Sequence, residues 1–332
     1  MAITDNRSQA LAQWLETIVG QAVEMTPAST DASFRRYFRV QMNGRSVIAM
    51  DAPPEQENNE AFIDVASRLS VAGLTVPEIL AEDLEQGFLL LSDLGLNTYL
   101  HVLNAENADL LFDGAVNTLL TMQANADVEG LPCYDEKLLR RDFELFPKYY
   151  LQQHLGLSLP AAIRRQLDQF FDQLVSHILA QPQVFVHRDF MPRNLMISSS
   201  SDTNKNPGVL DFQDAVFGPV SYDISCLFKD AFISWPEDKI TQWLRLYWRQ
   251  ALLKKIPVAK SFAAFQRDCD LMAVQRHLKV IGIFARICHR DGKPQYVDDV
   301  PRFFNYLRTA IARQPELILL GNIFNQIDGL PQ

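Results

Sequence analysis

One stretch of the sequence combines the residue types that phosphoryl-transfer chemistry needs. Residues 187–194 read H-R-D-F-M-P-R-N and follow the apolar segment 184–186, and Asp211 follows the next apolar segment. We expect the carboxylate of Asp189 to orient an acceptor hydroxyl and to take its proton as charge develops. Asn194 and Asp211 offer oxygen ligands, which suit Mg²⁺, and would hold the ion against the phosphates. The sequence therefore predicts one catalytic residue and two metal ligands that lie close together.

A second copy of the same tripeptide lacks these surroundings. His289-Arg290-Asp291 follows a helical segment, is followed by Gly292, and has Tyr296 where the asparagine would stand. We interpret this copy as a helix end and a turn. The first copy has a strand before it and an acidic residue after the next strand, so catalysis is favoured over coincidence there. His187 ends a buried strand, and we expect it to pack under the loop rather than react.

The elements that must position these residues form two predicted lobes in an α+β fold. Residues 1–95 are expected to be a nucleotide-binding lobe built on a small antiparallel sheet, and residues 96–332 a catalytic and substrate-binding lobe that is mostly helical. In the first lobe the predicted strands are 34–41, 45–50, 78–83 and 87–93, and the helices are 58–72 and a segment that ends at Gly20. In the second, helices are predicted at 104–125, 136–153, 160–181 and from 222 to 313, and strands at 184–187, 195–197 and 209–210, with a surface hairpin loop at 198–208.

Composition limits the class of protein. The 332 residues are 48% hydrophobic and 21% charged, as in globular proteins, and the formal net charge is −9 without a basic block, which argues against nucleic-acid binding. No apolar run approaches the roughly 20 residues of a membrane helix, and the N-terminus lacks a signal-peptide pattern. The four cysteines show no C-x-x-C spacing, as expected of reduced thiols. We therefore expect a cytoplasmic protein with a small-molecule partner and no membrane association, and we predict no oligomeric state.

The two motifs resemble the catalytic loop and the metal-binding strand of the protein-kinase-like superfamily. Neither a G-x-x-x-x-G-K-[ST] nor a G-x-G-x-x-G motif is present, and no A-P-E or long activation segment follows Asp211, which favours a kinase of small molecules. Over nearly its whole length the chain resembles the aminoglycoside phosphotransferase–choline kinase group, which implies a protein-kinase-like bilobal fold with ATP and Mg²⁺ as cofactors. More narrowly, residues 31–39, 50–54, 88–95, 187–196, 211–215 and 276–286 resemble the family of anomeric N-acetylmuramate/N-acetylglucosamine kinases of bacterial cell-wall recycling. That resemblance implies transfer of the ATP γ-phosphate to the C1 hydroxyl of the amino sugar.

The nucleotide site departs from the superfamily pattern because the first lobe contains no lysine. The strand expected to carry it reads V-I-A-M at 47–50, and the first lysine of the chain is Lys137. We expect an arginine of the preceding strand to replace it, with hydroxyls and backbone N–H groups up to Ser33 covering the phosphates. Adenine is expected to pair with backbone groups near Ser92 and Leu94. The candidate arginines are Arg35, Arg36 and Arg39.

The acceptor site is the least defined part of the sequence. A basic cluster at Arg286, His289, Arg290 and Lys293 suits an anionic sugar, and Gln213 stands where the superfamily has a glycine. Two alternatives stay open: a kinase for an aminoglycoside or amino alcohol, and a non-catalytic pseudokinase, against which retention of the three motif residues argues. Asp223 is expected to cap a helix. The candidate acceptor residues are Arg193, Gln213, Asp214 and Arg286.

Overall fold

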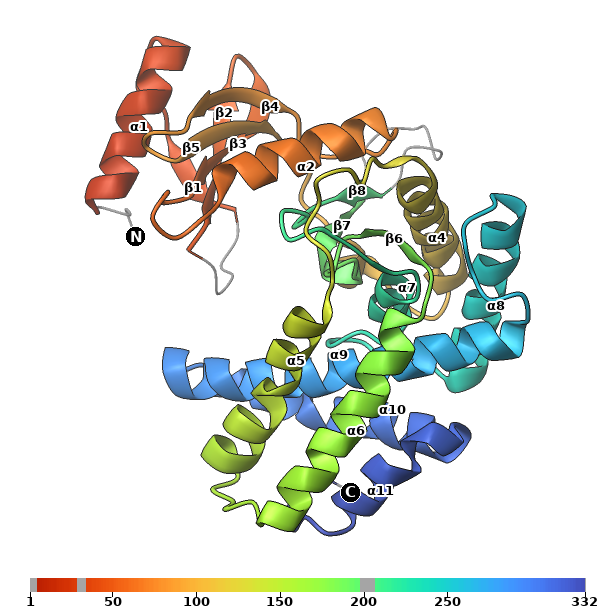
Figure 1. The fold of residues 1–332 in the computed structure, drawn as a ribbon. Coiled ribbons are helices and arrows are strands. Elements are labelled where there is room, and N and C mark those ends of the chain that lie inside the picture. The colour runs from red at the N-terminus through yellow and green to blue at the C-terminus, as the bar shows by residue number, and fades with distance from the viewer. Residues whose placement is uncertain (1–4, 29–33, 198–206, 332) are drawn as a thin grey trace.

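The computed structural model describes residues 5–28, 34–197 and 207–331, and it consists of a sheet part followed by a helical part (Figure 1). The first part contains a five-stranded antiparallel sheet with the order β1-β2-β3-β5-β4. Its strands are β1 (Met25–Pro27), β2 (Arg36–Met42), β3 (Arg45–Asp51), β4 (Ile79–Asp83) and β5 (Phe88–Ser92). Four of these strands match the sequence predictions to within about two residues, and β1 was not predicted.

The hairpin of β2 and β3 shows how local sequence sets this sheet. Met42 pairs with Arg45, so Asn43 and Gly44 form a two-residue turn. Their φ angles are 51° and 74°, the left-handed conformation that this turn requires and that asparagine and glycine tolerate. The hairpin predicted from the Asn-Gly pair is confirmed.

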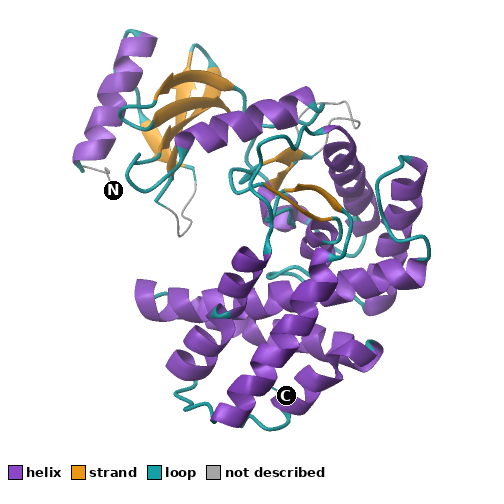
Figure 2. Cartoon of the chain, viewed as in Figure 1, coloured by secondary structure: helices purple, strands orange, loops and turns teal. Residues whose placement is uncertain are grey.

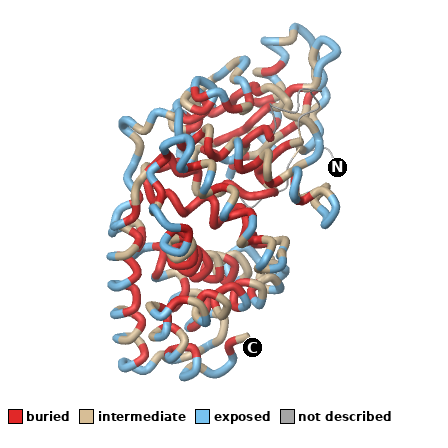
Figure 3. Tube along the Cα trace, turned by 90° about the vertical axis from the view of Figure 1, so that its right-hand side faces the viewer, coloured by how far each residue is buried: buried red, intermediate tan, exposed pale blue. Residues whose placement is uncertain are grey.

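Two helices cover opposite faces of the sheet. α1 (Asn6–Val19) places Leu11 and Leu15 against Phe38 and Val40 of β2 in a small core of its own. The other face carries Met50 and belongs to the main core together with α2 (Asn59–Val71) and the helical part. Buried segments therefore run through the interior of both parts (Figure 3). Alternate side chains of β2 point either towards α1 or towards the main core.

The second part is mostly helical, with a few short strands between residues 183 and 219 (Figure 2). Its longest described helix is α9, with 30 residues. This helix packs against α7, α10 and the segments 146–154 and 294–299. Gly282 permits one close approach, because a Cβ there would lie 2.3 Å from the carbonyl carbon of Leu145. The α-helices are α3 (Tyr99–Val102), α4 (Ala108–Asn125), α5 (Glu136–Phe143), α6 (Ala161–Leu179), α7 (Tyr222–Phe228), α8 (Glu237–Leu253), α9 (Phe262–Asp291), α10 (Val300–Arg313) and α11 (Ile318–Phe324).

Some elements differ from the sequence predictions. The single helix predicted at 136–153 is α5 followed by a π-helix, η1 (Phe146–His154), in which Leu155 N–H donates to the carbonyl of Tyr150. β6 (Gln183–Val186) pairs with β9 (Val216–Pro219), a strand that was not predicted. β7 (Leu195–Met196) pairs with β8 (Gly208–Val209), so the predicted pairing around the 198–208 loop is confirmed, although 198–206 lie outside the described residues. Short 3₁₀ helices are η2 (Pro192–Asn194), η4 (Pro294–Asp299) and η5 (Pro315–Leu317).

The junction between the two parts is held by the β7–β8 hairpin. Ile197 N–H donates to the Asn97 carbonyl at 2.9 Å, and Val209 N–H donates to the Thr75 carbonyl at 2.8 Å. The predicted boundary at residue 95 falls between β5 and α3, and the division into lobes at that point remains a proposal. Among the helices that the structure describes, none is both long and apolar enough to cross a membrane.

Candidate active site

His187 anchors the loop that carries the predicted catalytic residue. Its side chain is fully buried, its Nε2 lies 3.0 Å from the Leu210 carbonyl oxygen, and its Nδ1 accepts a hydrogen bond from Asp189 N–H at 3.2 Å. Burial lowers the pKa of His187 to about 4, so the ring is neutral at neutral pH. The prediction that His187 packs under the loop is confirmed.

Asp223 fixes the backbone of the same loop from a distance of more than thirty residues in the chain. Its carboxylate accepts the backbone N–H groups of His187 at 2.7 Å and of Arg188 at 2.9 Å. Arg188 has a φ of 76°, an uncommon left-handed conformation for a residue with a side chain. Burial raises the pKa of Asp223 to about 7. The predicted capping role of Asp223 is wrong, because Ser221 occupies the N-cap of α7.

The three residues predicted for catalysis and metal binding come together in one hydrogen-bonded group. Asn194 Nδ2 donates to the backbone carbonyl of Asp189 at 2.9 Å and to Asp211 Oδ2 at 3.2 Å. Gln213 Nε2 donates to Asp211 Oδ1 at 3.0 Å, and Asp211 itself has a φ of 64°. Two side chains with oxygen donors therefore meet beside the catalytic loop, and such a donor set fits a hard cation such as Mg²⁺.

Two buried cations of α9, Arg276 and Lys279, interact electrostatically with Asp189, and no sequence motif predicted them. Lys279 Nζ lies 3.6 Å from Asp142 Oδ2, and Arg276 Nη1 donates to the Lys229 carbonyl at 3.4 Å. Burial acts to lower the pKa of both cations, but acidic neighbours that include Asp189 raise it overall, so both stay charged. The only hint of these two residues in the sequence was that they lie in the segment 276–286, which resembles the amino-sugar kinases.

The three candidate arginines of the nucleotide site have different positions relative to the sheet. Arg36 shares the α1 face with Phe38 and donates to Asp51 Oδ2 at 2.5 Å, and it also pairs with Asp5 at the start of α1. Arg39 lies on the other face by strand alternation, whereas Arg35 stands one residue before β2 and pairs with Glu57. Since Arg36 is held on the face that turns away from the main core, we do not carry its nucleotide role forward.

Arg35 and Arg39 each pair with an acidic residue next to the junction or to α2. Arg35 Nη1 lies 2.9 Å from Glu57 Oε2, just before α2, and both side chains are largely buried. Arg39 Nε lies 2.7 Å from Asp93 Oδ2, and its Nη2 donates to the Gly95 carbonyl at 2.9 Å. Arg39 therefore holds residues 93–95, which follow β5, in place through these contacts.

The other predicted nucleotide contacts lie at the junction or outside the described residues. Ser92 Oγ accepts the Glu78 N–H at 2.8 Å, so its side chain is tied to the chain next to β4. Leu94 packs against Gly208 of β8, where an added Cβ would lie 2.9 Å from Leu94 Cδ1. Ser33 lies outside the residues that the structure describes.

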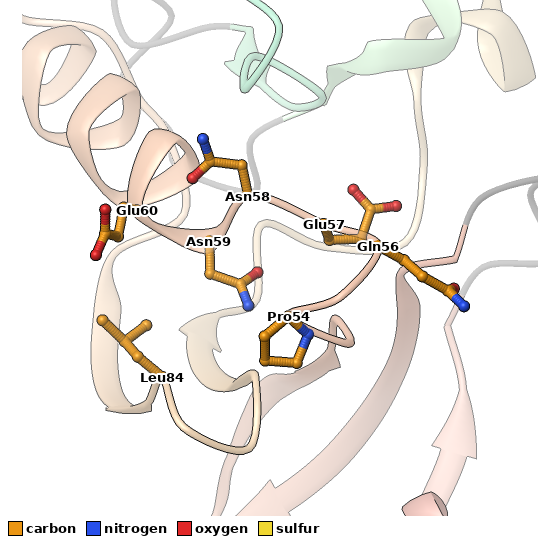
Figure 4. A pocket seen from close by; sticks show the side chains of 7 residues that line it. All are labelled: Pro54, Gln56, Glu57, Asn58, Asn59, Glu60 and Leu84. Carbon is orange, nitrogen blue, oxygen red and sulfur yellow. The ribbon is translucent and has the colours of Figure 1, made fainter.

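A pocket of about 460 Å³ opens at the N-terminus of α2 (Figure 4). Glu57 and Glu60 give it an acidic lining, which does not suit a phosphate group. None of the predicted site residues lines it. The lining residues are Pro54, Gln56, Glu57, Asn58, Asn59, Glu60 and Leu84.

The candidate acceptor residues occupy two different settings. Gln213 contacts the predicted metal ligand Asp211 as described above, and Asp214 Oδ1 lies 3.9 Å from Arg188 Nη1, in the loop of residues 187–194. The Arg193 guanidinium lies 5.0 Å from the ring centre of Phe232. The Arg286 guanidinium lies 5.8 Å from the ring centre of Tyr149 in η1, near the C-terminal end of α9.

Known proteins match this chain over most of its length. An N-acetylmuramate/N-acetylglucosamine kinase from Pseudomonas aeruginosa is 54% identical over 99% of this chain and 98% of its own length. Among solved structures, an ADP-bound aminoglycoside phosphotransferase has a TM-score of 0.59 at 14% identity and covers 90% of this chain and 97% of its own. The choline kinase LicA from Streptococcus pneumoniae has a TM-score of 0.63 at 12% identity, with 93% and 100% covered.

These solved structures establish a kinase-like fold, as the sequence predicted, with a small antiparallel sheet and a helical remainder. The model of the phosphotransferase enzyme family matches residues 24–265, which include the sheet, the catalytic loop and Asp211. The chain therefore belongs to the phosphotransferase enzyme family and is an ATP-dependent phosphotransferase.

Proposed function

We propose that this protein transfers the γ-phosphate of ATP to the anomeric C1 hydroxyl of N-acetylmuramate or N-acetylglucosamine. The observation that carries the proposal is the 54% identity, over nearly the full length, to a kinase named for these two sugars. The hydrogen-bonded group of Asp189, Asn194 and Asp211 supports it, because Asn194 joins the backbone of the proposed base Asp189 to the carboxylate of the proposed metal ligand Asp211.

In the proposed reaction, Asp189 accepts the proton of the acceptor hydroxyl as the oxygen attacks phosphorus. A hemiacetal hydroxyl is more acidic than the other hydroxyls of a sugar, so a carboxylate base removes the proton of the C1 hydroxyl more easily. Asn194 and Asp211 would hold Mg²⁺, which neutralises phosphate charge when bound. Gln213 orients the Asp211 carboxylate through its hydrogen bond at 3.0 Å.

For the nucleotide, we assign Arg35 as the cation that replaces the missing lysine. Its ion pair with Glu57 next to α2 gives it the acidic partner that such a cation needs to hold its orientation. Arg39 would act indirectly. It holds Asp93 and Gly95 in place, and adenine would bind beside that segment. The adenine contacts at Ser92 and Leu94 remain proposals through their backbone groups, and a phosphate contact from Ser33 remains a proposal as well.

For the acceptor, we assign Arg193 and Arg286 as candidates to bind the lactyl carboxylate of N-acetylmuramate. A guanidinium and a carboxylate form charge-assisted hydrogen bonds, which are stronger than neutral ones. Arg193 precedes the metal ligand Asn194 directly, and Arg286 stands on α9, seven residues after the buried Lys279. Asp214, paired with Arg188, is proposed to support the catalytic loop next to the acceptor. A cytoplasmic location and lobes of residues 1–95 and 96–332 complete the proposal.

A product assay tests the anomeric assignment. Phosphorylation at C1 removes the free reducing end of the sugar and creates an acid-labile glycosyl phosphate, whereas a 6-phosphate remains a reducing sugar. We expect incubation with Mg-ATP and either amino sugar to consume reducing ends in step with ADP formation. ADP formation with reducing ends untouched would reject the C1 position. Turnover of choline or an aminoglycoside, with neither amino sugar used, would move the substrate to the alternative class.

A further inference from the structure

We propose that His154, Cys288 and His289 form a binding site for a borderline-soft divalent cation such as Zn²⁺. His154 is the last residue of η1, and Cys288 and His289 lie in the last turn of α9. The two ring nitrogens and the thiol sulfur all lie within 4.8 Å of one another. The site is separate from the residues assigned to phosphoryl transfer, so its existence does not rest on the proposed function.

The spacing of the two imidazoles already matches a metal site. His154 Nδ1 and His289 Nε2 are 3.2 Å apart. In a tetrahedral zinc site with Zn–N bonds of about 2.0–2.1 Å, two nitrogen ligands are separated by roughly 3.3 Å, and nitrogen and sulfur by roughly 3.6 Å. The nitrogen separation therefore already suits two ligands of one ion. Without an ion the two nitrogens share a hydrogen bond, which a bound ion would replace after small rotations of the rings. The sulfur lies within 4.8 Å of both nitrogens and would move by at most about 1 Å.

The surroundings hold the ligands in place. The ring of His154 stacks on Tyr150, with ring centres 5.5 Å apart, which restricts its rotation. The ring of His154 also meets the ring of His289 edge-on, with ring centres 5.4 Å apart. The nearby cation Arg290 is paired with Asp291 at 2.6 Å, which offsets its repulsion of a metal ion.

The donor set selects the class of ion. Two imidazole nitrogens and one sulfur suit Zn²⁺ and its neighbours among the transition metals, with water in the fourth position, and they do not suit Mg²⁺ or Ca²⁺. The thiol binds as thiolate, so each ion that binds releases one proton from Cys288 to the solvent. The bound ion would join the end of η1 to the end of α9, and because the unfolded chain lacks the site, it would stabilise the folded state.

Cobalt substitution tests the proposal with a signal that does not depend on activity. The protein is stripped of metal with a chelator and titrated with Co²⁺ in excess Mg²⁺, which keeps the oxygen-ligand site occupied. We expect one Co²⁺ per chain, with a thiolate-to-cobalt charge-transfer band and the intense visible bands of tetrahedral cobalt. Zn²⁺ should displace the Co²⁺ and should raise the midpoint of thermal unfolding.

Matched variants assign the ligands. Cys288→Ser should lose the charge-transfer band, and His289→Gln, at an exposed position that tolerates substitution, should weaken Co²⁺ binding by about tenfold or more. Cys133→Ser and His177→Gln change the same residue types elsewhere and should bind as the unchanged protein does. The proposal is overturned if the unchanged protein shows no thiolate band, if Cys288→Ser keeps it, or if Cys133→Ser loses it.

Discussion

At the scale of single residues, the two copies of the tripeptide His-Arg-Asp show how surroundings decide a role. His187 and Asp189 are held by a strand and by Asp223, whereas His289 and Asp291 end α9 and are followed by Gly292 with a φ of 65°. The interpretation of the second copy as a helix end is confirmed. The copy at residues 289–291 can therefore serve as a control for the copy at residues 187–189.

The first prediction uses this internal control. Asp189→Asn should lower kcat by about a hundredfold or more, the usual effect of removing a positioned base, while ATP binding is largely kept. Asp291→Asn, in the exposed copy, should leave kcat within a factor of about two, since surface substitutions usually have small effects. Steady-state kinetics of both variants measure this. Near-normal turnover of Asp189→Asn would show that another group takes the proton.

The second prediction concerns the metal ligands. Asp211→Ala should abolish Mg²⁺-dependent ATP binding without unfolding the protein, because the carboxylate is exposed and its loss creates no core cavity. Gln213→Ala removes only the hydrogen bond that orients Asp211 and should weaken the same binding by about tenfold, within the range seen for such supporting contacts. Calorimetric titration with and without Mg²⁺ measures both. Unchanged Mg-ATP affinity in Asp211→Ala would place the metal elsewhere.

The third prediction is a pH dependence of stability. The pKa of His187 falls from its ordinary 6.5 to about 4 on folding, so its contribution to stability is complete above pH 6.5 and is lost as the pH falls towards 4. At about 1.4 kcal/mol per pKa unit, the loss is about 3 kcal/mol. Asp223 acts in the opposite sense, because its pKa is raised to about 7 and its contribution is lost as the pH rises from 4 to 7.

Comparison of variants separates these two effects. We expect the free energy of unfolding of His187→Gln, measured in urea, to fall less between pH 6.5 and 4 than that of the unchanged protein. His101→Gln removes an exposed histidine and should keep the original slope. Equal slopes for all three proteins would mean that the His187 ring is charged in the folded state.

At the scale of elements, Arg35 just before β2 and Arg36 at the first position of β2 have different acidic partners, which gives a fourth prediction. Arg35→Ala should raise the KM for ATP by about tenfold or more, because hydrogen bonds to charged groups contribute about 1.5–3 kcal/mol. Arg36→Ala should instead lower the midpoint of thermal unfolding, since it deprives the buried Asp51 of a partner, and should change the KM far less. A larger effect of Arg36 on the KM would reverse the roles assigned to the two arginines.

The contact between α9 and the start of η1 gives a fifth prediction. Gly282→Ala should destabilise the protein by about 1–3 kcal/mol, because its Cβ would meet the backbone of Leu145, which cannot rotate away. Gly321→Ala, in α11, meets only the Cγ2 of Ile311 at 3.0 Å and should cost much less. Urea unfolding of the two variants measures the difference. Equal stabilities would show that α9 can shift without cost.

Local patterns predicted these elements well where the cause was local. Asn43-Gly44 predicted its hairpin, and the motif at 187–194 predicted which side chains would meet Asp211. Nothing local marks the π-helix that begins at Phe146, because its wider turn shows only in the hydrogen bonds of the folded chain. β9 was missed because a four-residue strand that contains Gly218 and Pro219 lacks a strand pattern.

At the scale of the whole molecule, the unforeseen part of the site comes from contacts distant in sequence. Asp223 binds a loop 35 residues earlier, and Arg276 and Lys279 reach the same region from α9. Periodicity predicts that α9 is a helix but cannot tell which buried face meets the loop. The resemblance to known kinases indicated the two-part fold, and only the structure gave the acidic partners of Arg35, Arg36 and Arg39.

The left-handed backbone at Arg188 and Asp211 has a consequence for the evolution of the protein. Glycine adopts that conformation freely, whereas a residue with a Cβ costs about 1 kcal/mol or more there. A lineage selected only for thermal stability would drift towards glycine at both positions, and it would lose the carboxylate that we propose binds Mg²⁺ and the guanidinium that lies 3.9 Å from Asp214. The chain therefore keeps side chains at two positions where glycine would favour stability, so thermostable variants that retain the proposed metal ligand must gain their stability elsewhere in the fold.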